Sequence, residues 1–366
     1  MSFSRSAVLS SVAFVLIGTA GCEKGKQEPP QAPASVAVAT TPVEPQPAEP
    51  KTDPECVAPL GTGTPESVTV GKTVWEINGS TMTQSSPAKG DTLVIGAITD
   101  IKEDSDDNKA NLRHFAAWLT QNKADLILVA GDTGETAAQI EGALGVLAET
   151  KLPVFAISGN REGRKAFTAA MKSLRAKYGN VFSLNALRRV AMPQLEVISM
   201  PGYFNPHYIH AEDGCRYLPS DVGSVVDLAK LARAPTLLIS HGGPKQEGPL
   251  AIDRTSEGDN VGDPELAKAI ALAKIPFGVF GNIHEAGGHA TDLSGKAVVK
   301  PGELVDSLYL HPGPADAVRW GMNDKSESVG MAALLTVKGG KAKYEVLRRA
   351  DPEKKAAGAK RKKGRK

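Results

Sequence analysis

The feature that most constrains the fold of this chain is an alternation of short apolar runs with segments of helical period. The runs are nearly continuous in Val, Ile, Leu and Ala, which is typical of strands buried on both faces of a sheet. The runs that predict strands span residues 91–99, 125–131, 152–158, 194–202, 235–241 and 276–281. The segments that predict helices span residues 112–122, 136–149, 165–178, 222–233 and 264–273. This order predicts an α/β sandwich with largely buried sheets.

Two β-rich segments flank this alternating region. Residues 67–79 alternate between apolar and polar types and predict a short strand or hairpin. Residues 331–349 predict a hairpin with Gly339 and Gly340 at its turn. We therefore divide the chain into a signal peptide, a Pro-rich tether, a short β extension, a main domain and a basic tail, at residues 1–22, 23–55, 56–92, 93–350 and 351–366.

The first two segments have compositions that indicate export rather than a folded core. Residues 1–22 contain one basic residue, an apolar run shorter than the ~20 residues of a spanning helix, and small residues before Cys22. This stretch resembles a bacterial lipoprotein signal, in which the cysteine carries lipid, with an ordinary export signal as the alternative. Residues 23–55 hold eight of the 25 prolines and favour an extended tether. We expect an exported protein, lipid-anchored to a bacterial envelope membrane and facing the periplasm or the surface.

The last segment accounts for the net positive charge of the chain. Residues 354–366 contain eight Lys or Arg and no acid, whereas the whole chain has a formal net charge of +2. Such a run is either a solvated end or a segment attracted to anionic surfaces such as lipid headgroups. No aromatic residues lie among these charges, so nothing indicates a specific nucleic-acid site.

The cysteine count fits an exported chain. If Cys22 carries lipid, Cys56 and Cys215 remain as a pair, and a disulfide can persist in an oxidising compartment. The sequence therefore predicts a Cys56–Cys215 disulfide, although the spacing alone does not bring the two residues together.

Polar residues follow five of the six predicted strands, each next to a glycine or at the strand's end. They are Asp100, Asp132, Asn160, His241 and the pair Asn282 and His284. Carboxyl ends of strands are where α/β folds place their chemistry. A single Asp-Gly or Gly-Asn would be an ordinary turn, but the ordered set predicts a functional site.

In its order and spacing this series resembles the calcineurin-like metallophosphoesterase superfamily. That pattern runs Asp-x-His, Gly-Asp-x-x-Asp/Glu, Gly-Asn-His-Asp/Glu, a lone His, then Gly-His-x-His. The resemblance covers residues 93–314. It implies a four-layer sandwich of two mixed β-sheets packed face to face and flanked by helices. It also implies two divalent ions ~3.5–4 Å apart that act on a phosphoester.

The resemblance also implies a role for each matching residue. The first ion would bind Asp100, Asp132 and His284, and the second would bind Asp132, Asn160 and His241, with or without Asn282. Asp132 would bridge the two ions. Asp132, Asn160, Arg161 and Glu162 are the expected catalytic set, with Arg161 where many members place a histidine.

Two of the family's histidines are replaced in this chain. Lys102 stands at the histidine of Asp-x-His, and a protonated ammonium has no lone pair for a cation. We expect its nitrogen to pair with Asp100 and Asp132 in place of the first ion. Asn282 replaces the other histidine, although an amide oxygen still binds Mn, Mg or Ca. His207 and His210 are the alternative ligands that would complete the site.

These substitutions leave two functions open. One is an envelope hydrolase that uses one divalent ion (Mn, Mg, Fe or Zn) on a phosphorylated small molecule or an envelope phosphoester. The other is an inactive phosphoesterase-derived binding or scaffold module, with or without a metal.

Overall fold

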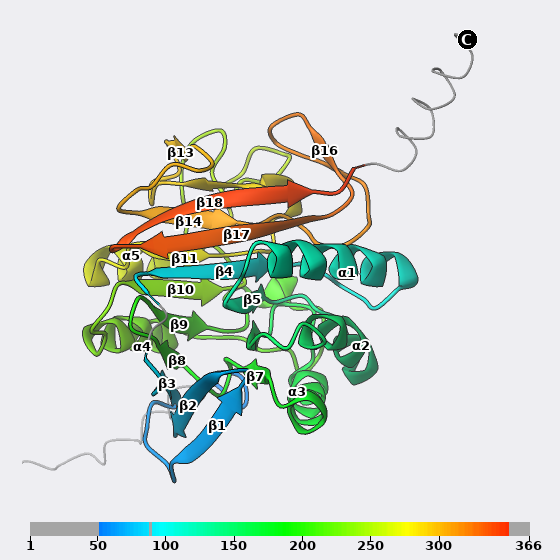
Figure 1. Ribbon diagram of the computed structural model, residues 1–366. Coiled ribbons are helices and arrows are strands. Elements are labelled where there is room, and N and C mark those ends of the chain that lie inside the picture. Colours follow the sequence, from blue (N-terminus) through cyan, green and yellow to red (C-terminus); the bar gives the residue numbers. More distant parts are fainter. Residues whose placement is uncertain (1–50, 88–89, 351–366) are drawn as a thin grey trace, which may run out of the picture. The chain divides into compact units, whose positions relative to one another are not determined.

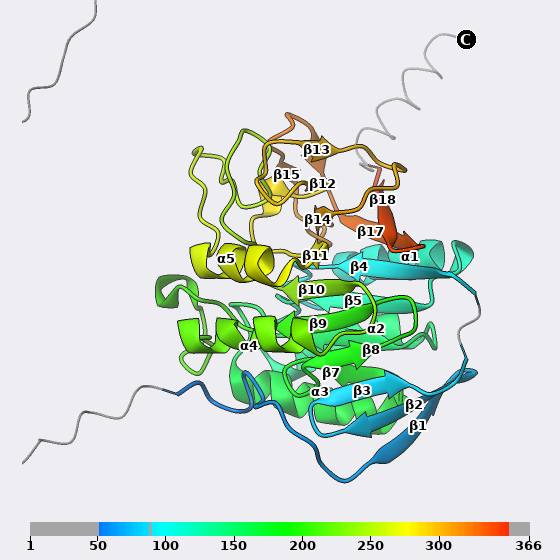
Figure 2. The ribbon, with the colours of Figure 1, turned by 90° about the vertical axis from the view of Figure 1, so that its left-hand side faces the viewer.

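Two β-sheets pack face to face and helices cover the outer face of each, in the computed structural model of residues 51–87 and 90–350 (Figures 1 and 2). The expected signal peptide, nearly all of the expected tether and the basic tail lie outside these residues. The α/β sandwich is thus confirmed, and its two sheets are both mixed.

Each layer of helices belongs to one sheet. Helices α1–α3 cover the six-stranded sheet, and α4 and α5 cover the ten-stranded sheet (Figures 1 and 2). Two short 3₁₀ helices, η1 and η2, lie in loops. The helices are α1 (Asp106–Gln121), α2 (Ala137–Ala148), α3 (Arg164–Tyr178), η1 (Pro206–Tyr208), α4 (Pro219–Lys230), α5 (Pro264–Ala273) and η2 (His284–Ala286).

The six-stranded sheet contains the first three strands of the alternating region and the C-terminal hairpin. Its strands in spatial order are β18 (Lys341–Arg348), β17 (Met331–Lys338), β4 (Thr92–Ile98), β5 (Leu126–Ala130), β6 (Val154–Ile157) and β7 (Val181–Ser183). Strands β4 to β7 are parallel, and β17 is antiparallel to β4.

The ten-stranded sheet contains the later strands of the alternating region. Its strands in spatial order are β1 (Glu66–Val70), β2 (Thr73–Asn78), β3 (Thr81–Gln84), β8 (Arg189–Ala191), β9 (Glu196–Met200), β10 (Thr236–Ser240), β11 (Phe277–Val279), β14 (Leu308–His311), β12 (His289–Thr291) and β13 (Val298–Val299). The expected β extension is therefore an edge of this sheet, because β3 pairs with β8. A separate pair is β15 (Trp320–Gly321) with β16 (Glu327–Ser328).

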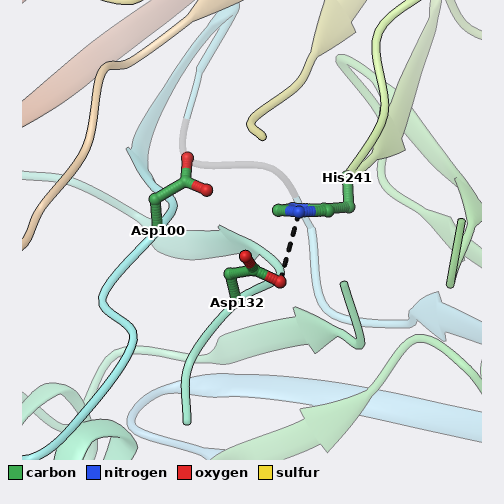
Figure 3. Close-up of side chains that lie close together, drawn as sticks. All are labelled: Asp100, Asp132 and His241. Atoms are coloured by element: carbon green, nitrogen blue, oxygen red, sulfur yellow. Dashed lines mark ion pairs between the residues drawn. The ribbon is translucent and has the colours of Figure 1, made fainter. Parts of the chain in front are cut away.

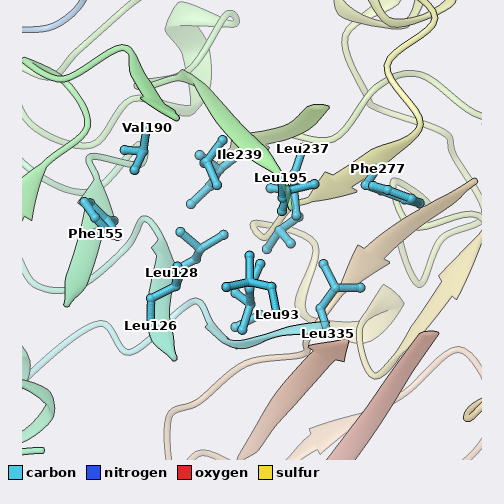
Figure 4. Close-up of a cluster of buried hydrophobic side chains, with 14 of the residues drawn as sticks. Leu93, Leu126, Leu128, Phe155, Val190, Leu195, Leu237, Ile239, Phe277 and Leu335 are labelled. Carbon is cyan, nitrogen blue, oxygen red and sulfur yellow. The ribbon is translucent and has the colours of Figure 1, made fainter. Parts of the chain in front are cut away.

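The main core lies between the two sheets and is built by alternate strand residues. On β5, Leu126 and Leu128 point into this core, while Ile127 and Val129 point to the helices. Figure 4 shows Leu126 and Leu128 facing Leu237 and Ile239 of the opposite sheet. Both faces of β5 are thus buried, which explains why its sequence is a continuous apolar run.

All five expected helices are present, and the largest difference is the start of α1. This helix begins at Asp106, six residues before its apolar period starts. Ser105 caps it by accepting a hydrogen bond from the Asn108 amide, and Asp106 and Asp107 occupy the first turn. Capping and acidic first-turn residues stabilise a helix start without apolar spacing.

Cys56 and Cys215 form a disulfide, with their Cα atoms 5.1 Å apart. The bond joins the first described residues to the loop that follows β9. No helix among the described residues is long and apolar enough to cross a membrane.

Candidate metal centre

The polar residues that follow the strands meet at one edge of the sandwich. Asp100 follows β4, Asp132 follows β5 and His241 follows β10, and Figure 3 shows their side chains pointing toward one another. One ligand atom from each of the three lies within 4.8 Å of the others, and all three residues are buried. In the described part of the chain this is the one group of three His, Cys, Asp or Glu residues so arranged.

The backbone at this edge is strained. Asp100, Lys102, Asp132 and Asn282 have φ angles of 54°, 68°, 55° and 74°. These angles lie in the left-handed region, which non-glycine residues rarely adopt and which costs ~1–3 kcal/mol each. Such strain persists where the surrounding structure demands it, and it gathers here at the ends of β4, β5 and β11.

Hydrogen bonds orient the acceptor atoms of two further groups toward Asp132. His241 Nδ1 lies 2.8 Å from the Ala130 carbonyl oxygen, so Nδ1 carries the proton and Nε2 keeps its lone pair in the neutral ring. The Asn160 amide nitrogen donates to the Tyr208 carbonyl at 2.8 Å, which turns Asn160 Oδ1 inward.

When the His241 ring is neutral, three acceptor atoms therefore converge without a proton between them. His241 Nε2 lies 3.0 Å from Asn160 Oδ1 and 3.2 Å from Asp132 Oδ1. Acceptor lone pairs at these distances repel one another, so the arrangement calls for a cation or for protonation of the ring. A divalent metal fits this donor set of carboxylate, amide oxygen and imidazole nitrogen.

The pKa values of His241 and Asp100 are shifted because buried negative charge at the site lacks a balancing cation. Burial by itself lowers the pKa of His241, but the charge and hydrogen bond of Asp132, together with Asp100, raise it to about 10. Burial by itself raises the pKa of Asp100, but the neighbouring His284 ring, 3.4 Å from Asp100 Oδ1, brings it well below its usual range. The site without metal therefore favours bound cations.

Lys102 does not pair with Asp100 and Asp132, so the expected arrangement is wrong. Its ammonium lies 2.7 Å from Asp316 Oδ2 and 4.1 Å from the centre of the Trp320 ring. Trp320 Nε1 donates to the other oxygen of Asp316 at 2.9 Å. A buried carboxylate and an aromatic face thus hold the ammonium, in place of the expected contacts with Asp100 and Asp132.

Two imidazole nitrogens near Asp100 have no hydrogen-bond partner within the described residues. They are Nε2 of His284, which lies 3.4 Å from Asp100 Oδ1, and Nε2 of His311, which is fully buried. Burial lowers the pKa of His311 to about 3, so its ring is neutral. His284 therefore lies beside Asp100, as expected for two ligands of the first ion.

Glu162 lies beneath the site instead of facing it, which corrects its expected catalytic placement. One oxygen accepts from the Thr133 amide and hydroxyl at 2.5 and 2.8 Å, and the other accepts from the Gly159 amide at 2.8 Å. Since both oxygens bind these groups, Glu162 joins the loop after β5 to the loop after β6. It therefore positions Asp132 and Asn160.

Arg161 contributes its backbone to the site and its side chain to the surface. Its amide donates to Asp132 Oδ1 at 3.1 Å, beside that of Asn160 at 3.0 Å. Its guanidinium pairs with Glu135 at 2.5 Å. These two hydrogen bonds from backbone amides hold the Asp132 carboxylate in place at the metal centre.

Asn282 is hydrogen-bonded to both Tyr203 and Asp100. Its amide nitrogen donates to the hydroxyl of Tyr203 at 2.8 Å, and its backbone N–H reaches the Asp100 carboxylate at 3.2 Å. Tyr203 was not expected from the sequence. The sequence feature that could have pointed to Tyr203 is its position after a strand, in a loop that also contains two histidines.

The two alternative ligands, His207 and His210, do not join the metal group. Both side chains are exposed on the loop after β9. The backbone of His210 still contributes, because its amide donates to the Asn160 carbonyl at 2.8 Å.

The two-sheet sandwich and its strand-end ligands define a protein of the metallophosphoesterase fold. A family model of calcineurin-like phosphoesterases matches residues 93–292, which is more than half of the 366 residues. The chain belongs to the calcineurin-like phosphoesterase family, so the resemblance in its motifs is confirmed. Members of this family use divalent metals.

Individual relatives are distant. The SbcD component of the SbcCD nuclease of Staphylococcus epidermidis is 27% identical over 133 residues, which make up 31% of this chain and 36% of that protein. The chain thus spans about a third of that relative. One solved crystal structure is 15% identical with a TM-score of 0.53, covering 71% of this chain and 100% of its own, and it supports the fold. The protein TT1561 of Thermus thermophilus is 13% identical with a TM-score of 0.48, covering 70% and 99%.

Proposed function

We propose that the chain is a metal-dependent phosphoesterase with an altered centre that holds one divalent ion. The observation that carries this proposal is the convergence of two oxygens on one imidazole nitrogen. Asp132 Oδ1 and Asn160 Oδ1 both lie within 3.2 Å of His241 Nε2. Asp100 completes the group on the neighbouring strand. When bound, a divalent ion supplies positive charge for the phosphoryl oxygens and activates water.

The residues of the chain orient and support this centre. The Ala130 carbonyl holds His241 in the tautomer that presents Nε2, and the Tyr208 carbonyl holds Asn160 with its oxygen inward. Glu162 fixes the separation of the two loops that carry Asp132 and Asn160. Such preorganisation removes reorganisation from the reaction step.

The altered character of the centre rests on two side chains. Lys102 is engaged with Asp316, and Asn282 donates to Tyr203. The Lys102 ammonium therefore offers no ligand atom to the group. The first-ion position therefore keeps Asp100, Asp132 and His284 as its ligands, one fewer than the family pattern. This supports one tightly held ion.

Metal analysis combined with an activity assay tests this function. The wild-type protein should bind one Mn²⁺ and hydrolyse 4-nitrophenyl phosphate or its bis-ester slowly. His241→Ala should lose both properties, whereas His207→Ala, at an exposed position on the neighbouring loop, should keep both. Retention of metal by His241→Ala would contradict the site.

A binding or scaffold module is the second candidate. It is favoured because two positions that supply ligands in the family pattern are here turned to Asp316 and Tyr203. This function predicts metal binding without hydrolysis of either ester. Hydrolysis that disappears in the His241→Ala variant would exclude it.

We also propose that the protein is exported and anchored by lipid on Cys22. The Cys56–Cys215 disulfide supports an oxidising compartment. The substrate would then be a phosphorylated small molecule or an envelope phosphoester, and the basic tail would contact anionic surfaces. Cys22→Ser should move the protein from the detergent phase to the aqueous phase. A variant that stays with the membrane would contradict lipidation at this residue.

A further inference from the structure

Tyr203 is built into the wall of the metal centre. The residue is 2% exposed, and its ring lies 6.2 Å from the ring of His241. A Cβ on Gly242 would lie 2.8 Å from Cε2 of Tyr203, so the ring fills the space that this glycine leaves open. The residue that follows His241 is thus small because an aromatic ring packs there.

The hydroxyl of Tyr203 has an unused proton. It accepts a hydrogen bond from Asn282 Nδ2 at 2.8 Å, but within the described residues nothing accepts its O–H. Other buried tyrosines do donate: Tyr217 to Asp263 at 2.9 Å and Tyr309 to the Ile275 carbonyl at 2.7 Å. A buried donor without an acceptor is rare and calls for an explanation.

The Tyr203 hydroxyl is linked to the metal centre through Asn282. Asn282, which it contacts, also donates its backbone N–H to the Asp100 carboxylate at 3.2 Å. The ring itself packs on His241. Burial raises the pKa of Tyr203 above its ordinary value, so the phenol stays protonated at neutral pH. The hydroxyl is therefore a neutral donor that contacts Asn282, while the ring of the same residue packs on His241.

We propose that Tyr203 is a substrate-binding residue whose hydroxyl donates a hydrogen bond to a terminal oxygen of the phosphoryl group held at the Asp100, Asp132 and His241 centre. This inference rests on the proposed function, since that function makes a phosphoryl group the ligand. The hydrogen bond from Asn282 polarises the hydroxyl and strengthens its donation to an anion. This proton donor is held by Asn282, the residue that stands where the family pattern has a metal-binding histidine.

Binding of inorganic phosphate to the full chain loaded with Mn²⁺ tests this role by calorimetry. Tyr203→Phe keeps the ring in the space beside Gly242 and removes only the hydroxyl. A hydrogen bond to an anion contributes enough that phosphate should bind about tenfold more weakly or worse, with an unchanged Mn²⁺ stoichiometry. Tyr217→Phe is the matched control, because it removes a buried hydroxyl that already has an acceptor. Its phosphate affinity should stay within about twofold of the wild-type value.

Gly242→Ala offers a second, independent variant. Its Cβ would displace the ring of Tyr203, so phosphate affinity should fall while bound Mn²⁺ is retained. Equal phosphate affinity in the wild-type protein and Tyr203→Phe would overturn the inference, and so would a wild-type protein that binds no phosphate at millimolar concentration.

The outcomes for the inference and for the proposed function are separable. If the protein hydrolyses esters but Tyr203→Phe binds phosphate normally, the function stands and the role of Tyr203 is wrong. If hydrolysis is absent but Tyr203→Phe still weakens phosphate binding, the role stands and the hydrolase function is wrong.

Discussion

The ion pair between Lys102 and Asp316 can be tested by a double-mutant cycle. Lys102→Met keeps the length of the side chain and removes the charge, and Asp316→Asn removes the opposite charge. Asp316 is 1% exposed and Lys102 is 12% exposed. The single variants and the double variant together measure the coupling between the two groups.

The structure sets the size of the expected effects. Lys102→Met leaves a buried carboxylate with the Trp320 indole as its remaining partner. It should lower the free energy of unfolding by about 3 kcal/mol, the lower end of the range for breaking a buried pair. Asp316→Asn should cost about 1 kcal/mol, because the ammonium can turn to solvent. The double variant should be less stable than the wild type by about 2 kcal/mol, which gives a coupling energy of about 2 kcal/mol.

Urea unfolding measures the stabilities, and metal analysis of the same samples measures site occupancy. Bound Mn²⁺ should be the same in Lys102→Met as in the wild type, because the ammonium lies at Asp316. A coupling energy below about 0.5 kcal/mol would refute the pairing. A second bound ion in Lys102→Met would show that the ammonium occupies the first metal position after all.

Three further predictions concern the supports of the site and the core. Glu162→Ala removes the acceptor for Thr133 and for the Gly159 amide, so the free energy of unfolding should fall by about 3 kcal/mol; unchanged Mn²⁺ affinity would contradict the role of Glu162 in positioning Asp132 and Asn160. Replacing Cys56 and Cys215 by Ser should lower the unfolding free energy by about 2–5 kcal/mol, and Mn²⁺ affinity should also fall because the loop of Cys215 orients Asn160. Phe155→Ala leaves a cavity at a fully buried site between the sheets and should lower the free energy of unfolding in urea by about 3–5 kcal/mol. A decrease below about 1 kcal/mol would show that the core closes around the cavity.

Much of the fold could be predicted because local sequence patterns specify its strands and helices. Apolar runs such as 126–130 become strands since both faces of the sheet are covered, and all five expected helices formed. Boundaries set by capping, such as the start of α1 after Ser105, do not follow from apolar spacing. Short strands such as β8 and β14 lack a pattern of their own, and they exist because neighbouring strands offer backbone partners.

The ligands of the metal group could be named from the sequence, whereas their partners were decided by the tertiary structure. Asp100, Asp132 and His241 follow strands whose carboxyl ends must meet at one edge, so their identity needs only the strand pattern. Lys102 turns to a carboxylate 214 positions away, and Tyr203 meets Asn282 across 79 positions. Side chains this distant in sequence come together only when whole elements pack, and no local period records that contact.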